Sequence, residues 1–427
     1  MKQVLLKNVQ IIDKRSPWHG KSCDIRIEEG QISDIQLKVP PKPEDHIIEL
    51  PKLHISPLWV DIHCYCGEPG YEERETFETL AQAAVAGGFG HLLVMPDNDP
   101  MPDQEASIEY IFKSTENLPV YIHVAACLTQ QSQGKIMSEM LSLSDAGAAA
   151  FSDGLSVVDD SRRLTNILLY ANQTGKTVFH RPGHTFLESE IWAAESVLAV
   201  SRGIQGIPAH AESLGIIRDL IIARYTGVGF HSIPVSSTHA IEMFKSFRET
   251  SDNFTLGTFA PYLYLTENAI SYFDPNAIIW PPLKPEEDVQ ALRKACKEGI
   301  IFAIASGHTP LNQEIKVHEP DLAKPGMITL ESAFGMIWTA LKSEMDISDV
   351  ISLISLNPAS LLNISLPVLD VGQKAEFTLF NPQECWTFTE KDIRSKSNNT
   401  PILGHKLVGK PYGIFAKGRL KLNENFL

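Results

Sequence analysis

Long apolar runs are missing from this 427-residue sequence. No stretch approaches the roughly 18 to 20 apolar residues that a transmembrane helix needs, so we expect no membrane-spanning segment. The apolar core near the N-terminus, Val4-Leu5-Leu6, is too short for a secretory signal peptide. We therefore expect a protein without a membrane partner.

Basic residues are also scarce. The chain has 37 lysine and arginine residues against 52 aspartate and glutamate residues, which gives a formal net charge of −15. Nucleic acids and anionic membranes attract proteins through a basic surface. Neither is therefore expected as a partner.

Cysteines are few and scattered. None of the six forms a Cys-x-x-Cys pair, and Cys64-x-Cys66 lacks the second pair that a structural zinc site needs. We expect reduced thiols in a cytoplasmic protein, not a disulfide-bonded or zinc-thiolate protein.

The apolar residues that are present alternate with helical stretches. From residue 56 onward, eight short apolar runs predict strands, and longer helical patterns lie between most of them. This alternation predicts an α/β fold, a (β/α)₈ barrel of the TIM type. The predicted strands cover 58–63, 90–95, 119–125, 148–152, 176–180, 227–233, 253–259 and 300–306. The predicted helices cover 74–87, 104–116, 161–173, 187–203, 210–225, 238–248, 286–298, 328–342 and 347–356.

The two ends of the chain have a different pattern, rich in short strands. At the N-terminal end, strands alternate with turns such as Glu29-Gly30, and strand character returns after residue 366. We predict that residues 1–55 and 366–427 form one small β-sheet domain. The barrel then occupies residues 56–365.

Polar residues follow several of the predicted barrel strands. In a barrel of this kind, the residues at the C-terminal ends of the strands carry the chemistry. His63, Asp153 and His180 end three different strands and could hold a zinc or manganese ion with one further group or water. A lone histidine at a strand end is more often structural, so a pocket without a metal stays open as an alternative.

The stretch from Asp61 to Gly67 contains half of a metal-enzyme motif. Side chains alternate along a strand, so residues 63, 65 and 67 are expected to face the same way. A two-metal hydrolase needs histidine at the first two of these positions. Here the first is His63 but the second is Tyr65.

Ordered blocks along nearly the whole chain resemble the dihydroorotase branch of the amidohydrolase superfamily. They include Asp61-x-His63-x-x-x-x-Glu68-Pro69-Gly70, Met95-Pro96-Asp97-Asn98, Phe151-Ser152-Asp153-Gly154, Pro281-Pro282-Leu283, Asn357-Pro358-Ala359 and Ser395-Lys396-Ser397-Asn398-Asn399. The resemblance implies an enzyme of pyrimidine biosynthesis that opens or closes the dihydroorotate ring with one or two zinc ions. A metal-bound hydroxide attacks a carbonyl, and a strand-8 aspartate moves the proton.

The same resemblance shows where this chain departs from the family pattern. Retained metal ligands are His63, Asp153 and His180, so zinc is the expected ion if any metal binds. The strand-8 aspartate is replaced by Gly307, so no catalytic residue is expected. At the other pocket positions, Tyr65 and Pro234 replace two histidine ligands, and Gly67 replaces the arginine that grips the substrate carboxylate. Asp97 replaces a substrate-binding asparagine, Tyr262 a histidine and Trp280 an asparagine. His308, next to Gly307, is also expected in the pocket.

These losses favour a non-catalytic homologue of dihydroorotase. By the resemblance, such members act as structural partners of aspartate transcarbamoylase, and a homo-oligomer is expected. A second hypothesis is an active metal-dependent cyclic amidohydrolase with a rearranged site. Its candidate replacement ligands are His184, His231, His239 and His308. A third hypothesis is a small-molecule binding protein that uses the former active-site pocket.

Overall fold

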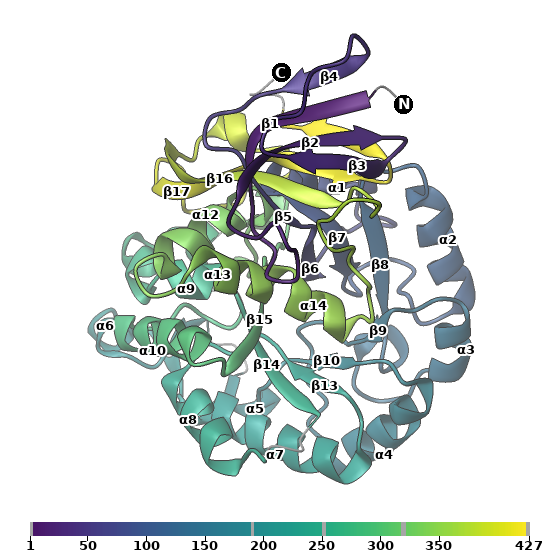
Figure 1. Ribbon diagram of the computed structural model, residues 1–427. Helices are drawn as coiled ribbons and strands as arrows, with labels where there is room; N and C mark the ends of the chain where they lie inside the picture. Colours follow the sequence, from purple (N-terminus) through teal and green to yellow (C-terminus); the bar gives the residue numbers. More distant parts are fainter. Residues whose placement is uncertain (1–2, 189–191, 250–252, 317–321, 424–427) are drawn as a thin grey trace.

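Eight parallel strands form the wall of a barrel in the computed structural model, which describes residues 3–188, 192–249, 253–316 and 322–423 (Figure 1). The strands follow one another around the wall in chain order: β6 (Trp59–Cys64), β7 (Phe89–Val94), β8 (Tyr121–Ala126), β9 (Ala150–Phe151), β10 (Val178–His180), β13 (Phe230–Ser232), β14 (Phe254–Phe259) and β15 (Ile301–Ala305). Each overlaps a strand predicted from the apolar runs, so the barrel prediction is confirmed. The Tyr65 N–H donates to the His308 carbonyl at 2.9 Å, which brings the last strand next to the first and nearly closes the wall.

The barrel strands are apolar because both of their faces are buried. Every residue of β6 and β7 is buried. A parallel sheet needs this, since its own barrel interior covers one face and helices cover the other. Trp59 of β6 packs against the rings of Phe334 and Phe380, at centroid distances of 4.6 and 5.4 Å.

Helices surround the barrel (Figure 1). The longer ones are α1 (Phe77–Gly87), α2 (Glu105–Thr115), α4 (Ser161–Ala171), α7 (His210–Thr226), α8 (Thr238–Phe247), α10 (Glu286–Lys297), α12 (Leu330–Leu341) and α13 (Ile347–Ile354). The shorter ones are α3 (Met140–Asp145), α5 (Thr185–Glu188), α6 (Val197–Ser201), α9 (Ala260–Tyr264), α11 (Gln313–Lys316) and α14 (Leu356–Leu361). Thr76, Asp160 and Ser237 cap α1, α4 and α8, because their side-chain oxygens accept backbone N–H groups of the first turn. In the described ranges, no helix has both the length and the apolar content to span a membrane.

The helix predicted over 187–203 is wrong. A two-residue strand, β11 (Ala193–Ala194), interrupts it and pairs with β12 (Gly206–Ile207). The short α6 begins only after Ser196, whose hydroxyl accepts the Ala199 N–H at 3.1 Å. Residues 189–191 lie outside the described residues. A short apolar pattern fits a strand as well as a helix, and here the pairing with a later segment decides.

A second sheet combines strands from both ends of the chain and lies beside the barrel (Figure 1). Its strands are β1 (Gln3–Ile11), β2 (Ser22–Glu28), β3 (Gln31–Gln36), β4 (Asp45–Ile48), β5 (His54–Pro57), β16 (Phe377–Thr387), β17 (Lys406–Ala416) and β18 (Arg419–Leu422). The main order is β18-β17-β16-β5-β1-β2-β3, and β4 pairs with β1. The two ends meet where β5 and β16 run antiparallel, with Pro57 opposite Phe377. The predicted sheet built from both termini is therefore confirmed, whereas the exact domain limits stay predictions.

The carboxylate of Asp61 joins the first barrel strand to the end of the last. It is fully buried and accepts hydrogen bonds from the Ser306 backbone N–H, at 2.8 Å, and from the Ser306 hydroxyl. Burial raises the pKa of Asp61 to about 6, and the Ser306 hydrogen bonds oppose that rise. A carboxylate held by two donors in this way acts as a clamp, because it joins β6 to the residue that follows β15 and so stabilises the closed barrel.

Replacing Asp61 by alanine should lower the free energy of unfolding by about 2–4 kcal/mol, because the buried Ser306 N–H and hydroxyl lose their acceptor. Urea unfolding of the purified variant measures this. Asp349→Ala is the matched control, since Asp349 forms an exposed ion pair with Lys14 and its loss should cost about 1 kcal/mol or less. Equal stability of the Asp61 variant and the wild type would contradict the clamp.

Two histidines lie side by side where the barrel meets the terminal sheet. His91 of β7 and His123 of β8 are joined through ring nitrogens 2.9 Å apart, and Tyr121 stacks on His91 at 4.5 Å. The Tyr121 hydroxyl donates to Glu376, just before β16, at 2.7 Å. Burial is the main cause that lowers the pKa of His91 to about 3 and the pKa of His123 to about 4. Both rings are therefore neutral when folded near pH 7.

These two histidines should make the stability depend on pH. In the unfolded chain they take up protons below the ordinary pKa of about 6.5, whereas the folded chain takes them up only near pH 3–4. The free energy of unfolding should have its full value above about pH 6.5. It should decrease as the pH is lowered towards 4, by at most roughly 1.4 kcal/mol per pH unit for each histidine. His91→Gln should make this fall shallower in urea unfolding, whereas His19→Gln, at an exposed site, should not. An unchanged slope for His91→Gln would argue against the effect.

Candidate functional site

His63 lies inside the barrel near the end of β6. It is 1% exposed, and neither ring nitrogen has a hydrogen-bond partner among the described residues. The neighbouring rings are aromatic, with centroid distances of 4.7 Å to Phe259 and 5.4 Å to Tyr65. Burial lowers the pKa of His63 to about 3, so the imidazole is neutral near pH 7.

His231 on β13 is a second histidine with an unpartnered nitrogen. Its Nδ1 lies 2.7 Å from the Thr255 hydroxyl, and its Nε2 has no partner within the described ranges. Burial, and then the nearness of His63, lowers the pKa of His231 to about 3. Gly257 leaves room for the ring, since a Cβ there would lie 2.3 Å from His231 Nε2. Together the two rings hold three free nitrogens inside the barrel.

The other two retained ligand positions are engaged in hydrogen bonds within the protein. The Asp153 carboxylate accepts the Thr129 backbone N–H at 2.9 Å and the Thr129 hydroxyl at 2.5 Å. His180 places Nδ1 2.8 Å from the buried Asp219 carboxylate, and its Nε2 accepts the Val158 N–H at 3.3 Å. A histidine with both nitrogens in use has no lone pair left for a metal ion.

These donors do not fit a zinc site. Zinc takes three or four protein nitrogen, oxygen or sulfur ligands at roughly 2.0–2.3 Å. Throughout the described part of the chain, no group of three or more histidine, cysteine, aspartate or glutamate side chains is placed to hold a metal ion. His63 lies on β6, whereas Asp153 follows β9 and His180 ends β10, and the three side chains do not converge as ligands.

The Phe259 side chain occupies the space beside Gly307. Phe259 ends β14, is 4% exposed and faces both His63 and Tyr262. Gly307 follows β15 with a φ of +70°, and a Cβ there would come within 2.6 Å of the Phe259 ring. The ring and a larger residue at 307 cannot both fit without movement. The sequence did not single out Phe259, although strand alternation from Gly257 puts it on the inner face.

A small cavity beside Phe259 marks the mouth of the barrel. Its volume is about 10 Å³, and Tyr262, Trp280 and Gly307 are among the residues that line it. This is about the space that one water molecule needs. The Tyr262 hydroxyl donates to the Pro281 carbonyl, and the Arg181 guanidinium lies 5.6 Å from the Trp280 ring. The aromatic residues therefore fill the mouth instead of enclosing a substrate-sized pocket.

Known proteins related to this chain cover nearly its whole length. The Amidohydrolase family model matches residues 48–421. This chain belongs to the amidohydrolase family. The dihydroorotase of Syntrophus aciditrophicus (strain SB) is 32% identical over 426 residues, which cover 99% of this chain and 100% of that protein. The dihydroorotase of Sulfurihydrogenibium sp. (strain YO3AOP1) is 31% identical over 419 residues, with 98% and 99% covered.

Solved structures of two hydantoinases have the same fold. The L-hydantoinase (dihydropyrimidinase) from Arthrobacter aurescens superimposes with a TM-score of 0.84 at 19% identity, over 98% of this chain and 96% of that chain. The D-hydantoinase (dihydropyrimidinase) from Thermus sp. gives a TM-score of 0.81 at 19% identity, over 99% and 95%. At this identity the likeness shows the fold alone. The predicted resemblance to dihydroorotases is confirmed by the sequence relatives.

In this member of the amidohydrolase family, a side chain larger than glycine does not fit at position 67, where the resemblance implies an arginine. Gly67 has a φ of +90°, and a Cβ there would lie 2.8 Å from the Tyr71 carbonyl oxygen. Arg74 lies over the Tyr71 ring at 4.1 Å and pairs with Asp97 at 3.4 Å. Burial raises the pKa of Asp97 to about 6, although Arg74 and Lys324 favour its charged form. The guanidinium near position 67 is thus already paired with a carboxylate of the protein.

A buried tyrosine, Tyr65, and a buried proline, Pro234, occupy two further positions at which the resemblance implies histidine ligands. Tyr65 is 6% exposed, and a Cβ at Gly154 would lie 2.7 Å from its hydroxyl oxygen. Burial raises the pKa of the Tyr65 hydroxyl, so the phenol stays protonated. Pro234 is buried and has no side-chain atom that can ligate.

His308 holds a helix in place. Its Nδ1 accepts the backbone N–H groups of Thr329, at 3.0 Å, and Leu330, at 3.3 Å, where α12 begins. Its Nε2 lies 3.5 Å from a carboxylate oxygen of Glu75, and both side chains are fully buried. His308 was predicted to line the pocket, but it does not line the mouth cavity; its ring bonds to the start of α12, a role that the sequence did not reveal.

Substitutions at Gly307 and Phe259 should be coupled. Gly307→Ala alone sets a Cβ at positive φ against the Phe259 ring and should lower the free energy of unfolding by about 1–3 kcal/mol. Phe259→Ala alone leaves a cavity and should cost about 3–5 kcal/mol. The double variant should be about 1 kcal/mol more stable than the sum of the two losses, because the clash is gone. Urea unfolding of the four proteins measures this coupling.

Gly372→Ala is the control for backbone strain in this cycle. Gly372 has a φ of +84° with no atom within 4 Å of a Cβ, so its substitution is strained but meets no ring. It should not couple to Phe259→Ala. Strict additivity of Gly307→Ala and Phe259→Ala would refute the packing described here.

Proposed function

We propose that this chain is a non-catalytic homologue of dihydroorotase whose function is structural support of a partner protein. The observation that carries the proposal is the Phe259 ring, which packs against His63 and takes up the space beside Gly307. In an active relative of this type, a histidine ligand and an aspartate ligand would have to meet there.

The replaced groups would each supply a large part of the reaction. A positioned general base typically contributes about 10²–10⁴-fold, and Gly307 offers none. A bound metal lowers the pKa of water to near neutrality, which creates the nucleophile. The donors that remain do not fit such a metal, and the mouth cavity of about 10 Å³ has room for only about one water molecule. The losses are not additive, but each alone is severe.

Aspartate transcarbamoylase is the partner that the resemblance suggests. A barrel with a filled mouth keeps its outer surface, and a supporting role needs only that surface. The match to dihydroorotases over 99% of the chain supports an intact scaffold. The proposal includes a cytoplasmic location and assembly into a homo-oligomer.

An active cyclic amidohydrolase with a rearranged site is the second candidate. The unpartnered ring nitrogens of His63 and His231 favour it, because each neutral ring can present one lone pair, and a buried lone pair without a partner is what a metal would satisfy. A third ligand and a displaced Phe259 ring would then be needed. Of the other candidates, His308 is bound to the start of α12 and His239 is exposed on α8. Small-molecule binding in the former pocket is disfavoured by the size of the mouth cavity.

The purified protein should contain far less than one zinc per chain and show no dihydroorotase activity. Metal analysis and a dihydroorotate assay measure this, with the Syntrophus aciditrophicus relative prepared in parallel as the positive control. The variant with Tyr65→His, Gly67→Arg, Pro234→His and Gly307→Asp should stay inactive, because Phe259 still fills the site. Adding Phe259→Ala should raise zinc binding above that of the four-fold variant. Stoichiometric zinc together with activity in the wild type would refute the proposal.

The partner role is tested separately. The tagged chain should co-purify with aspartate transcarbamoylase of the same organism, in a complex that size-exclusion chromatography resolves. The Syntrophus aciditrophicus dihydroorotase, carrying the same tag, is the specificity control. A chain that elutes unchanged when that enzyme is added would rule this partner out.

A further inference from the structure

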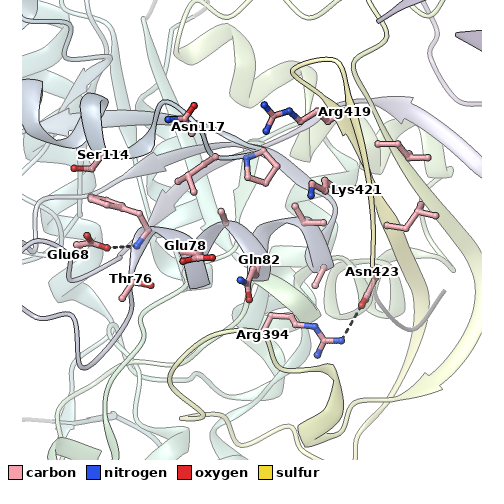
Figure 2. A pocket seen from close by; sticks show the side chains of 18 residues that line it. Glu68, Thr76, Glu78, Gln82, Ser114, Asn117, Arg394, Arg419, Lys421 and Asn423 are labelled. Carbon is pink, nitrogen blue, oxygen red and sulfur yellow. Dashed lines mark hydrogen bonds between the residues drawn. The ribbon is translucent and has the colours of Figure 1, made fainter. Parts of the chain in front are cut away.

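A hollow lies away from the barrel mouth, between α1 and the edge strand β18. Its volume is about 860 Å³ (Figure 2). Ligand sites in proteins typically enclose roughly 300–1,000 Å³. We call this hollow the β18 groove. The pocket positions named for the barrel do not line it, so it is separate from the former active site.

One wall of the β18 groove is an unpaired strand edge. β18 is the edge strand of the terminal sheet, and among the described residues it pairs only with β17. The Asn423 N–H donates to the Tyr412 carbonyl at 2.8 Å. In an antiparallel pair, hydrogen-bonded and non-bonded positions alternate. The backbone N–H and C=O groups of Leu420 and Leu422 therefore point away from β17, where a further strand would bind.

The floor of the groove is apolar and comes from α1. Ala81, Val85 and Ala86 line it and are at most 9% exposed. Leu420 and Leu422 are half-buried on the opposite face of β18, where they pack against the apolar core of the terminal sheet. The four residues of β18 span roughly 13 Å. The length of α1 beside them, about 16 Å, gives an added strand a support along its whole length.

Cations line the rim of the groove, in a chain whose net charge is −15. Arg419 and Lys421 are exposed on β18. Arg394 lies at the Asn423 end of the groove, with one nitrogen 3.3 Å from the Asn423 side-chain oxygen (Figure 2). In the described ranges, none of these three side chains forms an ion pair with a carboxylate. Of the two nearby acidic residues, Glu68 already accepts the Phe77 N–H at 2.7 Å. That hydrogen bond leaves the Glu68 carboxylate charged, so two acidic side chains, Glu68 and Glu78, oppose the three cations.

We propose that β18 is a strand-addition site for an extended acidic segment of a partner protein. Main-chain groups of that segment bind the free edge at Leu420 and Leu422. Its carboxylates face Arg419 and Lys421 on the α1 side of the sheet, and its apolar side chains lie on the opposite face, next to Leu420 and Leu422. A second copy of this chain is a poor occupant, because antiparallel pairing of two β18 strands would set these cations against each other. This proposal does not depend on whether the barrel is catalytic.

The test uses fluorescently labelled peptides and the full-length protein. The acidic probe is acetyl-Glu-Val-Glu-Val-Glu-Val-amide, and the basic probe has lysine in place of glutamate. Anisotropy should show saturable binding of the acidic probe, weaker at 0.5 M salt, and no binding of the basic one. A third probe carries N-methyl groups on alternate amides, which blocks strand pairing, and it should not bind.

Protein variants separate charge from strand pairing. Arg419→Glu with Lys421→Glu should weaken binding of the acidic probe by about tenfold or more, since each exposed pair contributes up to about 1 kcal/mol and reversal adds repulsion. Lys135→Glu with Lys297→Glu is the matched control at exposed sites elsewhere. Leu420→Pro removes an N–H that faces the groove but not a bond to β17, so it should abolish binding without lowering the thermal midpoint much.

Three results would overturn the proposal. The first is the absence of saturable binding by the acidic probe. The second is equal binding of the N-methylated probe, which would indicate adsorption by charge alone. The third is undiminished binding by a folded Leu420→Pro variant.

Discussion

The hydrogen bonds between Asp61 and Ser306 fix the geometry on which the rest of the barrel interior depends. They join the first strand to the end of the last, so the residues that follow each of them are held at one rim. His63 follows Asp61 by two positions and Gly307 follows Ser306 by one. Because both are fixed, the space between them has a set size, and the Phe259 ring matches it.

The barrel interior shows two ways in which a protein can bury the polar side chains that would otherwise bind a metal ion. Asp153 and His180 are supplied with protein donors and acceptors from Thr129, Asp219 and Val158. His63 is instead enclosed by aromatic rings as a neutral imidazole, with no hydrogen bond to any part of the chain that the structure describes. The second solution carries the desolvation cost of an unpaired buried group, typically about 1–3 kcal/mol. Ring packing around His63 offsets part of that cost.

Much of the fold could be predicted because its signals are local. The eight apolar runs predicted the eight buried parallel strands, and the short strand patterns near both ends of the chain predicted the second sheet. The helix expected over 187–203 failed because the pairing of β11 with β12 joins segments that are not adjacent in the chain. The site was harder for the same reason. Motif positions identified what is missing at Gly307, but what fills the gap is Phe259, a residue from another strand.

The joining of both chain ends in one sheet also constrains how the protein is made. β5 pairs with β16, about 320 residues later in the chain. At roughly 5–20 residues per second, the ribosome needs on the order of 20–60 s to synthesise that interval. Throughout that time β5 has an open edge while the barrel strands are already emerging. The nascent chain therefore carries an unpaired strand edge until its last tenth is made, the kind of edge on which chaperones act and aggregation begins.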